Sequence, residues 1–240
     1  MPALHPYSIF PLGDSALTIE FGNTIDRDLN DRVLHLFYCL QGSGLPYTGL
    51  VPAYSSLTVH YDTAAIRAQL QPGKTTFEQM AKWIEELAGE ESLPVLSGSR
   101  LVEIPVCYEE SFAPDAQWLA MQKGISIEEL VQLHTASSYR VFMIGFLPGF
   151  AYMGEVDERL AWPRRQVPRL SVPAGAVGIA GRQTGIYPLP SPGGWQIIGR
   201  TPLQLFNRSK KEPVRLRPGD EVKFHSIDQY EFTHYEDGIA

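Results

Sequence analysis

In the N-terminal part of the chain, apolar residues recur with a period of two in some segments and with helical spacing in others. Leu57, Val59 and Tyr61 alternate with polar residues, which predicts a strand over Ser56–Tyr61. Three more strands are predicted from short apolar runs and from the turn residues that separate them: Tyr7–Leu12, Ala16–Phe21 and Gly49–Ala53.

Two segments of the same region carry the helical spacing. The apolar positions of the first are Leu29, Val33, Leu36, Phe37 and Leu40, with Gly42 and Gly44 as its stop signal. The second begins near Thr75 or Thr76, and its apolar face is Phe77, Met80, Ile84 and Leu87. Two strands, a helix, two strands and a helix predict a small α+β sandwich with its helices on one sheet face.

The pattern changes after a stretch rich in Pro, Gly and Ser, Glu90–Ser99, which predicts a linker. We therefore expect one domain over residues 1–92 and a second over residues 100–240. The second domain begins with a predicted strand, Arg100–Tyr108. Two short helices follow, Asp115–Lys123 and Ser126–His134, the latter with a capping box of Ser126 and Glu129.

From Tyr139 onward, short apolar runs alternate with turn signals and predict strands. The predicted strands are Tyr139–Phe146, Gly175–Ala180, Trp195–Arg200, Leu203–Phe206, Glu221–His225 and Tyr230–His234. Many short strands with regular turns favour a β-barrel or a sandwich. The fold class expected for the whole chain is therefore α+β.

Composition narrows the class of protein. The 240 residues suffice for one large or two modest domains. A net charge of −7 argues against nucleic acid or an anionic membrane as partner. The two distant cysteines, Cys39 and Cys107, suggest neither a metal site nor a disulfide, and no secretory signal is visible. A cytoplasmic location is expected.

The densest concentration of Gly and Pro lies in Ser171–Arg200. Proline excludes a regular helix there, and glycines allow a ligand to approach backbone amides. The residue types at Ser191, Gly193 and Gly194 are those of an anion-binding turn, with Trp195 as a side of the pocket. The alternative is a β-bulge with Trp195 in the core. Since the segment has neither the helix nor the lysine of a P-loop, ATP binding by this chain alone does not follow.

Three segments resemble a known family. They are GFLPGFAYMG (145–154), PRRQVPRLSVPAGAVGIAGRQTGIYPLPSPGGWQIIGRTP (163–202) and RPGDEVKF (217–224). They are similar to the family of the 5-oxoprolinase B subunit, which also holds allophanate hydrolase subunit 1, the KipI-type kinase inhibitors and part of the carboxyltransferase domain of urea carboxylases. The resemblance extends over essentially the whole chain.

The resemblance implies a ferredoxin-like N-terminal domain and a cyclophilin-like C-terminal β-barrel. It also implies two partners, a 5-oxoprolinase C-type subunit and a third 5-oxoprolinase subunit. Such a complex opens the lactam of 5-oxoproline to L-glutamate and hydrolyses ATP, so ATP is expected at the level of the complex. No metal and no biotin are expected in this chain. The alternatives are a KipI-type inhibitor of a sensor histidine kinase and a carboxyltransferase-like component of urea or allophanate metabolism.

Several polar residues are candidates for substrate binding. Gln183 and Thr184 are expected on a bend between glycines. They would either hydrogen-bond to an amide or carboxylate of the substrate or form hydrogen bonds with neighbouring backbone groups. Arg169, Arg182 and Arg200 belong to a basic concentration in an acidic protein, and a guanidinium clasps a carboxylate through two hydrogen bonds. Most such arginines in proteins are solvated or paired with carboxylates.

His134 and Tyr187 complete the candidate set. His134 shares the apolar stripe of its predicted helix and is either a general base or a packed histidine. Tyr187 belongs either to the pocket or to the core. No catalytic residue is identified, because no nucleophile with a neighbouring base is visible. That absence favours a site shared with another subunit.

Overall fold

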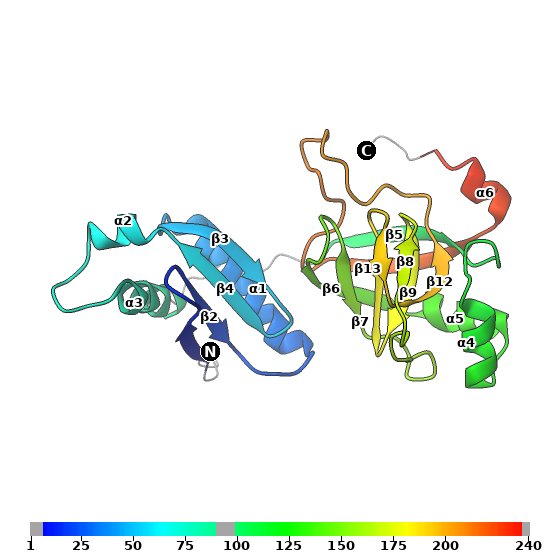
Figure 1. Ribbon diagram of the computed structural model, residues 1–240, viewed down its shortest axis with the longest axis horizontal. Helices are drawn as coiled ribbons and strands as arrows, with labels where there is room; N and C mark the ends of the chain where they lie inside the picture. The colour runs from blue at the N-terminus through cyan, green and yellow to red at the C-terminus, as the bar shows by residue number, and fades with distance from the viewer. Residues whose placement is uncertain (1–6, 90–98, 237–240) are drawn as a thin grey trace. The chain divides into compact units, whose positions relative to one another are not determined.

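The computed structural model describes residues 7–89 and 99–236 (Figure 1). The chain divides into two compact units, the second of which begins at Ser99. The predicted linker lies almost entirely in residues 90–98, outside the described ranges. Each unit is considered by itself below.

The N-terminal unit is a four-stranded antiparallel sheet with helices packed on it. Its strands are β1 (Ser8–Pro11), β2 (Ala16–Glu20), β3 (Tyr47–Pro52) and β4 (Ser56–Tyr61), in the order β1-β2-β4-β3. Its helices are α1 (Arg27–Gly42), α2 (Thr63–Arg67) and α3 (Thr76–Ala88). The four predicted strands and two predicted helices are confirmed. The sequence analysis missed α2, which Asp62 caps by accepting hydrogen bonds from Ala64 N and Ala65 N.

The core of this unit lies between the sheet and the helices. Leu17 and Ile19 of β2 and Leu57 of β4 are fully buried against Val33 of α1 and Met80 of α3. These are the positions that the period-two and helical patterns marked as apolar. Thr75 begins α3 as a capping box, because Thr75 Oγ1 accepts from Glu78 N and Glu78 Oε2 accepts from Thr75 N.

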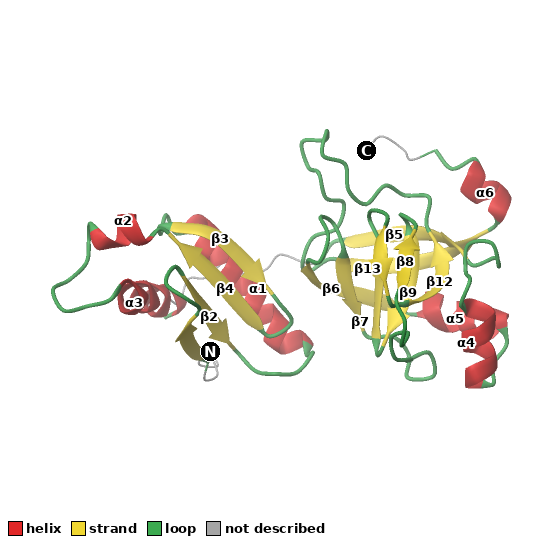
Figure 2. Cartoon of the chain, in the orientation of Figure 1, coloured by secondary structure: helices red, strands yellow, loops and turns green. Residues whose placement is uncertain are grey.

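The C-terminal unit is built around a closed barrel of seven strands, ordered β10-β7-β6-β13-β5-β12-β9 (Figure 2). Their bounds are β5 (Leu101–Cys107), β6 (Ser138–Ile144), β7 (Ala151–Gly154), β9 (Ala176–Ala180), β10 (Gln183–Ile186), β12 (Gln196–Arg200) and β13 (Glu221–Ile227). The first and last of these in the chain, β5 and β13, pair in parallel, whereas their other neighbours are antiparallel. The barrel alternative of the sequence analysis is therefore confirmed.

Two layers cover the barrel. Helices α4 (Ala116–Lys123) and α5 (Ile127–Ala136) pack against each other, and their Leu119 and Leu130 join the barrel core. A small ladder of β8 (Arg169–Val172) and β11 (Ser191–Gly193) accompanies a separate apolar cluster. Both predicted helices are confirmed. Ser126 caps α5 by accepting from Glu129 N, but the predicted capping box is incomplete, because the Glu129 carboxylate pairs with Arg159 instead.

Two predicted strands are wrong. Tyr230–His234 lies in a helix, α6 (Gln229–Thr233), because Asp228 and Glu231 form a capping box that starts it. Leu203–Phe206 is not a strand, since its only ladder contact is an isolated bridge between Phe206 and Val214. The bend predicted at Gln183–Thr184 is instead the start of strand β10.

The ferredoxin-like and cyclophilin-like descriptions remain predictions. Within the described residues, no helix is long and apolar enough to cross a lipid bilayer.

Candidate functional site

A cluster of aromatic rings lies on the outer side of the barrel wall. The ring of Trp195 is 5.4 Å from that of Phe150, edge to face, and 6.0 Å from that of Tyr152. Two glycines of the wall make room for it. A Cβ at Gly185 would lie 3.0 Å from Trp195 Cζ3, and one at Gly178 would lie 3.0 Å from Trp195 Cβ. These glycines therefore admit an aromatic ring of the protein itself.

Tyr187 belongs to the same aromatic cluster and is almost fully buried. Its ring packs edge to face on Phe150 at 5.2 Å, and its hydroxyl lies where a Cβ at Gly193 would be. Burial raises the pKa of Tyr187, and a hydrogen bond with the backbone of Trp195 partly opposes that rise. Gly193 therefore allows the Tyr187 hydroxyl to reach the backbone that precedes β12.

An ion cluster around Asp115 lies next to the backbone of β12. Asp115 is 4% exposed, and its Oδ1 accepts from Arg169 Nη2 at 2.6 Å and from Arg165 Nη1 at 3.1 Å. Its Oδ2 accepts from Ile197 N at 2.6 Å. Charge-assisted bonds of this kind hold both arginines in fixed directions. Asp115 thus acts as an anchor for two guanidinium groups rather than as a helix cap.

Two buried polar atoms in this part of the molecule have no hydrogen-bond partner within the described ranges. They are Arg169 Nη1 and Gln196 Oε1. The amide nitrogen of Gln196 donates to the carbonyl of Pro163 at 3.0 Å. Buried donors and acceptors are rarely left unpaired, because each loses its hydrogen bonds to water. A free donor on Arg169 and a free acceptor on Gln196 are therefore the atoms here that have capacity for another group.

The predicted anion-binding turn forms a strand instead of a cradle. Ser191 pairs with Val172 and Gly193 with Arg169 across the β8–β11 ladder. The Ser191 hydroxyl is mostly buried and donates to the carbonyl of Pro192. The carbonyl of Gly194 accepts a hydrogen bond from Arg165 N at 2.7 Å. This brings Arg169, Tyr187, Ser191, Gly193, Gly194 and Trp195 together in one region.

His134 and Thr184 lie elsewhere, inside the barrel core, and both are completely buried. The Thr184 hydroxyl donates to the carbonyl of Gly178 at 3.2 Å. With that proton used, His134 Nε2–H is the donor to Thr184 Oγ1 at 3.0 Å, and His134 Nδ1 accepts from the Tyr108 hydroxyl at 2.7 Å. The four groups form a single directed chain of hydrogen bonds.

Burial determines the protonation states of His134 and Tyr108 in this chain of hydrogen bonds. Burial lowers the pKa of His134 to about 3 and raises the pKa of Tyr108 well above its usual value. Both groups are therefore neutral at pH 7, which the directed chain requires. His134 is placed as a packed histidine. Substrate contact by His134 or Thr184 stays a prediction.

The remaining candidates, Gln183 of β10 and Arg200 of β12, lie beside opposite ends of β9. Gln183 is opposite Ala180, and Arg200 is opposite Ala176. Because each strand residue advances about 3.3 Å, the two positions are separated by roughly 13 Å of strand. Arg182, next to Gln183, pairs with Glu155 at 2.8 Å on the surface. Arg200 Nε donates to the carbonyl of Ala174 at 2.9 Å. One compact ligand would not contact both ends.

Several contributors had not been selected from the sequence. Asp115 was placed only as a helix start, and its arginine partners are 50 and 54 residues away, so no local pattern marks it. Tyr108 belonged to a predicted strand with no visible partner. Arg164, whose guanidinium carbon is 5.9 Å from the Trp195 ring centre, is not among the candidates derived from the sequence.

Metal ligands and reactive thiols do not gather in the described chain. Among residues 7–89 and 99–236, no group of three or more His, Cys, Asp or Glu residues could hold a metal ion. Cys39 and Cys107 are buried, and burial raises the pKa of both thiols. Since the thiolate is the reactive form, neither cysteine is suited to nucleophilic attack.

Comparison with known proteins identifies the fold and the family. Residues 7–216 match the family described as carboxyltransferase domain, subdomain C and D. The chain belongs to this family.

Its members include close relatives along nearly the full chain. The chain is 42% identical to the 5-oxoprolinase B subunit of Bacillus subtilis, over 96% of this chain and 97% of that one. It is 48% identical to the 5-oxoprolinase B subunit of Escherichia coli O157:H7, over 89% and 93%. The crystal structure of TTHA0988 has a TM-score of 0.76 and 35% identity, over 89% of this chain and 40% of that longer one.

Proposed function

We propose that this chain is the B subunit of a 5-oxoprolinase, which opens 5-oxoproline to L-glutamate together with a C-type subunit and a third subunit. The observation that carries the proposal is identity of 42–48% to two proteins of that name across nearly their whole length. ATP would be bound and hydrolysed by the assembled complex in the cytoplasm.

The geometry of the barrel supports a binding role more than a chemical one. The Asp115 cluster fixes Arg165 and Arg169, and Arg169 keeps one free donor. A guanidinium in that state suits the carboxylate of 5-oxoproline. His134 is held neutral by burial, and the cysteines are buried, so the described residues offer no activated nucleophile. We therefore assign the reacting groups to a site completed by another subunit.

The candidate residues divide by position. We propose that the region around Trp195 contacts the substrate, with Arg169 holding its carboxylate. Arg182 and its neighbour Gln183 would contact a partner subunit or ATP instead, and so would Arg200, since Gln183 and Arg200 flank opposite ends of β9. Thr184 and His134 would hold β10 in place from inside the barrel.

The test is reconstitution. The chain is purified alone and with the two partner subunits encoded by the same organism, and ATP hydrolysis that depends on 5-oxoproline is measured with glutamate formation. We expect activity only from the complete mixture. Full activity from this chain alone would overturn the shared site, and inactivity of a complete, correctly assembled complex would overturn the substrate.

The same preparation separates the two alternatives. A carboxyltransferase-like component would need a biotin carrier, so its activity would depend on added biotinylated carrier protein. A kinase inhibitor would reduce autophosphorylation of a sensor histidine kinase without any 5-oxoproline turnover.

A further inference from the structure

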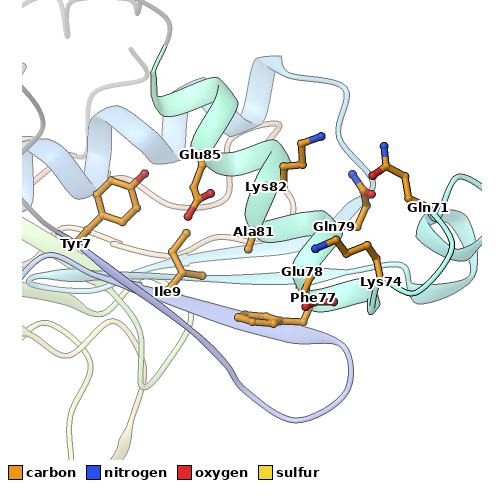
Figure 3. Close-up of a pocket in the computed structure, with 10 residues that line it drawn as sticks. All are labelled: Tyr7, Ile9, Gln71, Lys74, Phe77, Glu78, Gln79, Ala81, Lys82 and Glu85. Atoms are coloured by element: carbon orange, nitrogen blue, oxygen red, sulfur yellow. The ribbon is translucent and has the colours of Figure 1, made fainter.

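A groove in the N-terminal unit lies between the edge strand β1 and helix α3, as the close-up in Figure 3 shows. It arises from how the helices are distributed. Helix α3 packs over β2, and α1 packs over β3 and β4, so neither helix is centred on β1. Ile9, Phe77 and Ala81 give the groove an apolar lining. Its volume of about 460 Å³ is within the range of small-ligand sites.

A polar amide in the lining makes no hydrogen bond to the described protein. Gln79 is only 5% exposed as a whole residue and lines the groove. Its amide atoms are not among the buried atoms that lack a partner, so they reach the solvent in the groove. The amide of Gln79 therefore offers donors and an acceptor to a ligand that displaces this water.

The free edge of β1 supplies backbone groups at the same place. In the β1–β2 ladder, Leu12 N donates to Ala16 O, which makes Leu12 and Ala16 a hydrogen-bonded pair. Hydrogen-bonded and non-hydrogen-bonded pairs alternate along an antiparallel ladder. The pair of Ile9 and Ile19 is therefore non-hydrogen-bonded, so the N–H and C=O of Ile9 point away from β2. An extended chain in the groove could bond to both.

Opposite charges stand at the two ends of the groove. Figure 3 shows Lys74 with Gln71 and Gln79 towards one end, and Glu85 with Tyr7 towards the other. The Glu78 carboxylate accepts from the backbone N–H and hydroxyl of Thr75 in the capping box, and Lys74 lies beside it as a cation of this end. A second lysine in the lining, Lys82, pairs with Glu86. From Glu78 to Glu85 the helix rises about 10 Å, which equals the length of roughly three extended residues.

We propose that this groove binds a short extended peptide of about three residues with free termini. Its ammonium group lies near Glu85 and its carboxylate near Lys74. Its main chain bonds to Ile9 in the manner of an added strand, and one of its amides pairs with Gln79. Such a site is separate from the barrel and does not depend on the proposed oxoprolinase activity.

The probe is tri-alanine, titrated into the ¹⁵N-labelled full chain while backbone and side-chain amide resonances are followed. We expect saturable shifts at the Ile9 backbone amide and the Gln79 side-chain amide. Acetylation of the peptide's N-terminus or amidation of its C-terminus should each weaken binding at least fivefold. No saturable shift at these two amides, or equal binding of free and blocked peptides, would overturn the proposal.

Matched variants test each end of the groove. Glu85→Gln should weaken binding of free tri-alanine but leave binding of the acetylated peptide unaffected. Lys74→Gln should likewise weaken binding of free tri-alanine but leave binding of the amidated peptide unaffected. Asp28→Asn is the control, since Asp28 in the first turn of α1 carries the same charge but does not line the groove. Equal effects of Glu85→Gln and Asp28→Asn would also contradict the proposal, because a general change of charge would then explain them.

Discussion

His134 donates from Nε2 to the hydroxyl of Thr184 at 3.0 Å, and both side chains are completely buried. Helix α5 carries the imidazole and strand β10 carries the hydroxyl. This bond is one of the links between the helical layer and the barrel wall. Protonation of the imidazole at Nδ1 would remove the acceptor for the Tyr108 hydroxyl, so the chain of hydrogen bonds requires a neutral His134, which leads to the first prediction.

Stability should fall in mild acid because of His134. Its folded pKa of about 3 is below the ordinary value of 6.5, so the unfolded state takes up the proton first as pH falls. The contribution is fully present above pH 6.5 and is lost progressively below it. Between pH 7.5 and 5.5 this group alone should remove about 1.4 kcal/mol of unfolding free energy.

Urea unfolding of the wild type and of His134→Gln at the two pH values measures that loss. The variant should be less stable at both, yet its stability should depend less on pH by about the same 1.4 kcal/mol. An identical pH dependence in the two proteins would show that His134 is not the group that titrates.

Replacing Asp115 should destabilise the barrel unit. Asp115→Asn removes the charge that pairs with Arg165 and Arg169 while keeping the shape of the side chain. Because the carboxylate is 4% exposed, we expect a loss of about 2 kcal/mol in unfolding free energy. The control is Asp157→Asn, whose ion pair with Arg159 is accessible to water and should contribute much less to stability. Similar losses in both variants would contradict a special role for Asp115.

Two glycines should respond differently to alanine. At Gly185 a Cβ would be 2.9 Å from Ala151 O and 3.0 Å from Trp195 Cζ3, so the ring or the strand must move. At Gly194 the nearest atom would be 3.7 Å away, an ordinary contact. Gly185→Ala should therefore lower the unfolding free energy by about 1–3 kcal/mol, and Gly194→Ala should change it by less than about 0.5 kcal/mol. Thermal unfolding of both variants decides whether the glycine serves to seat Trp195.

Arg169 should affect substrate binding beyond its structural bond. In the reconstituted complex, Arg169→Gln should raise KM for 5-oxoproline about tenfold or more, as expected for loss of a charged hydrogen bond. Arg165→Gln removes a bond to the same carboxylate and serves as the control. If both variants change KM equally, Arg169 only holds Asp115 in place.

The regular parts of the fold follow from sequence patterns, but the site depends on long-range contacts. Alternation and helical spacing identified the strands and helices of the N-terminal sheet, because one face of each is buried there. The β8 and β11 strands escaped notice, since Pro192 and Gly193 read as a turn. The partners of Asp115, 50 and 54 residues away, have no local signature at all.

One error could have been avoided from the sequence. The pattern of short apolar runs and turn signals predicts a strand over Tyr230–His234, although Asp228 and Glu231 have the spacing of a capping box. Capping is a specific local signal that outweighs β-propensity in a short exposed segment.

The parallel pairing of β5 with β13 has a consequence for how this protein is made. Arg100, just before β5, bonds to Asp220, which is 120 residues later and just before β13. Joining such distant segments carries a large loop-closure entropy, and it slows folding. During synthesis β5 must wait for β13, with one ladder edge open, while the intervening residues are made, since Arg100 and Asp220 are 120 residues apart. The barrel is therefore most prone to aggregate during its own translation, and chaperone dependence of the nascent chain should end abruptly once β13 emerges.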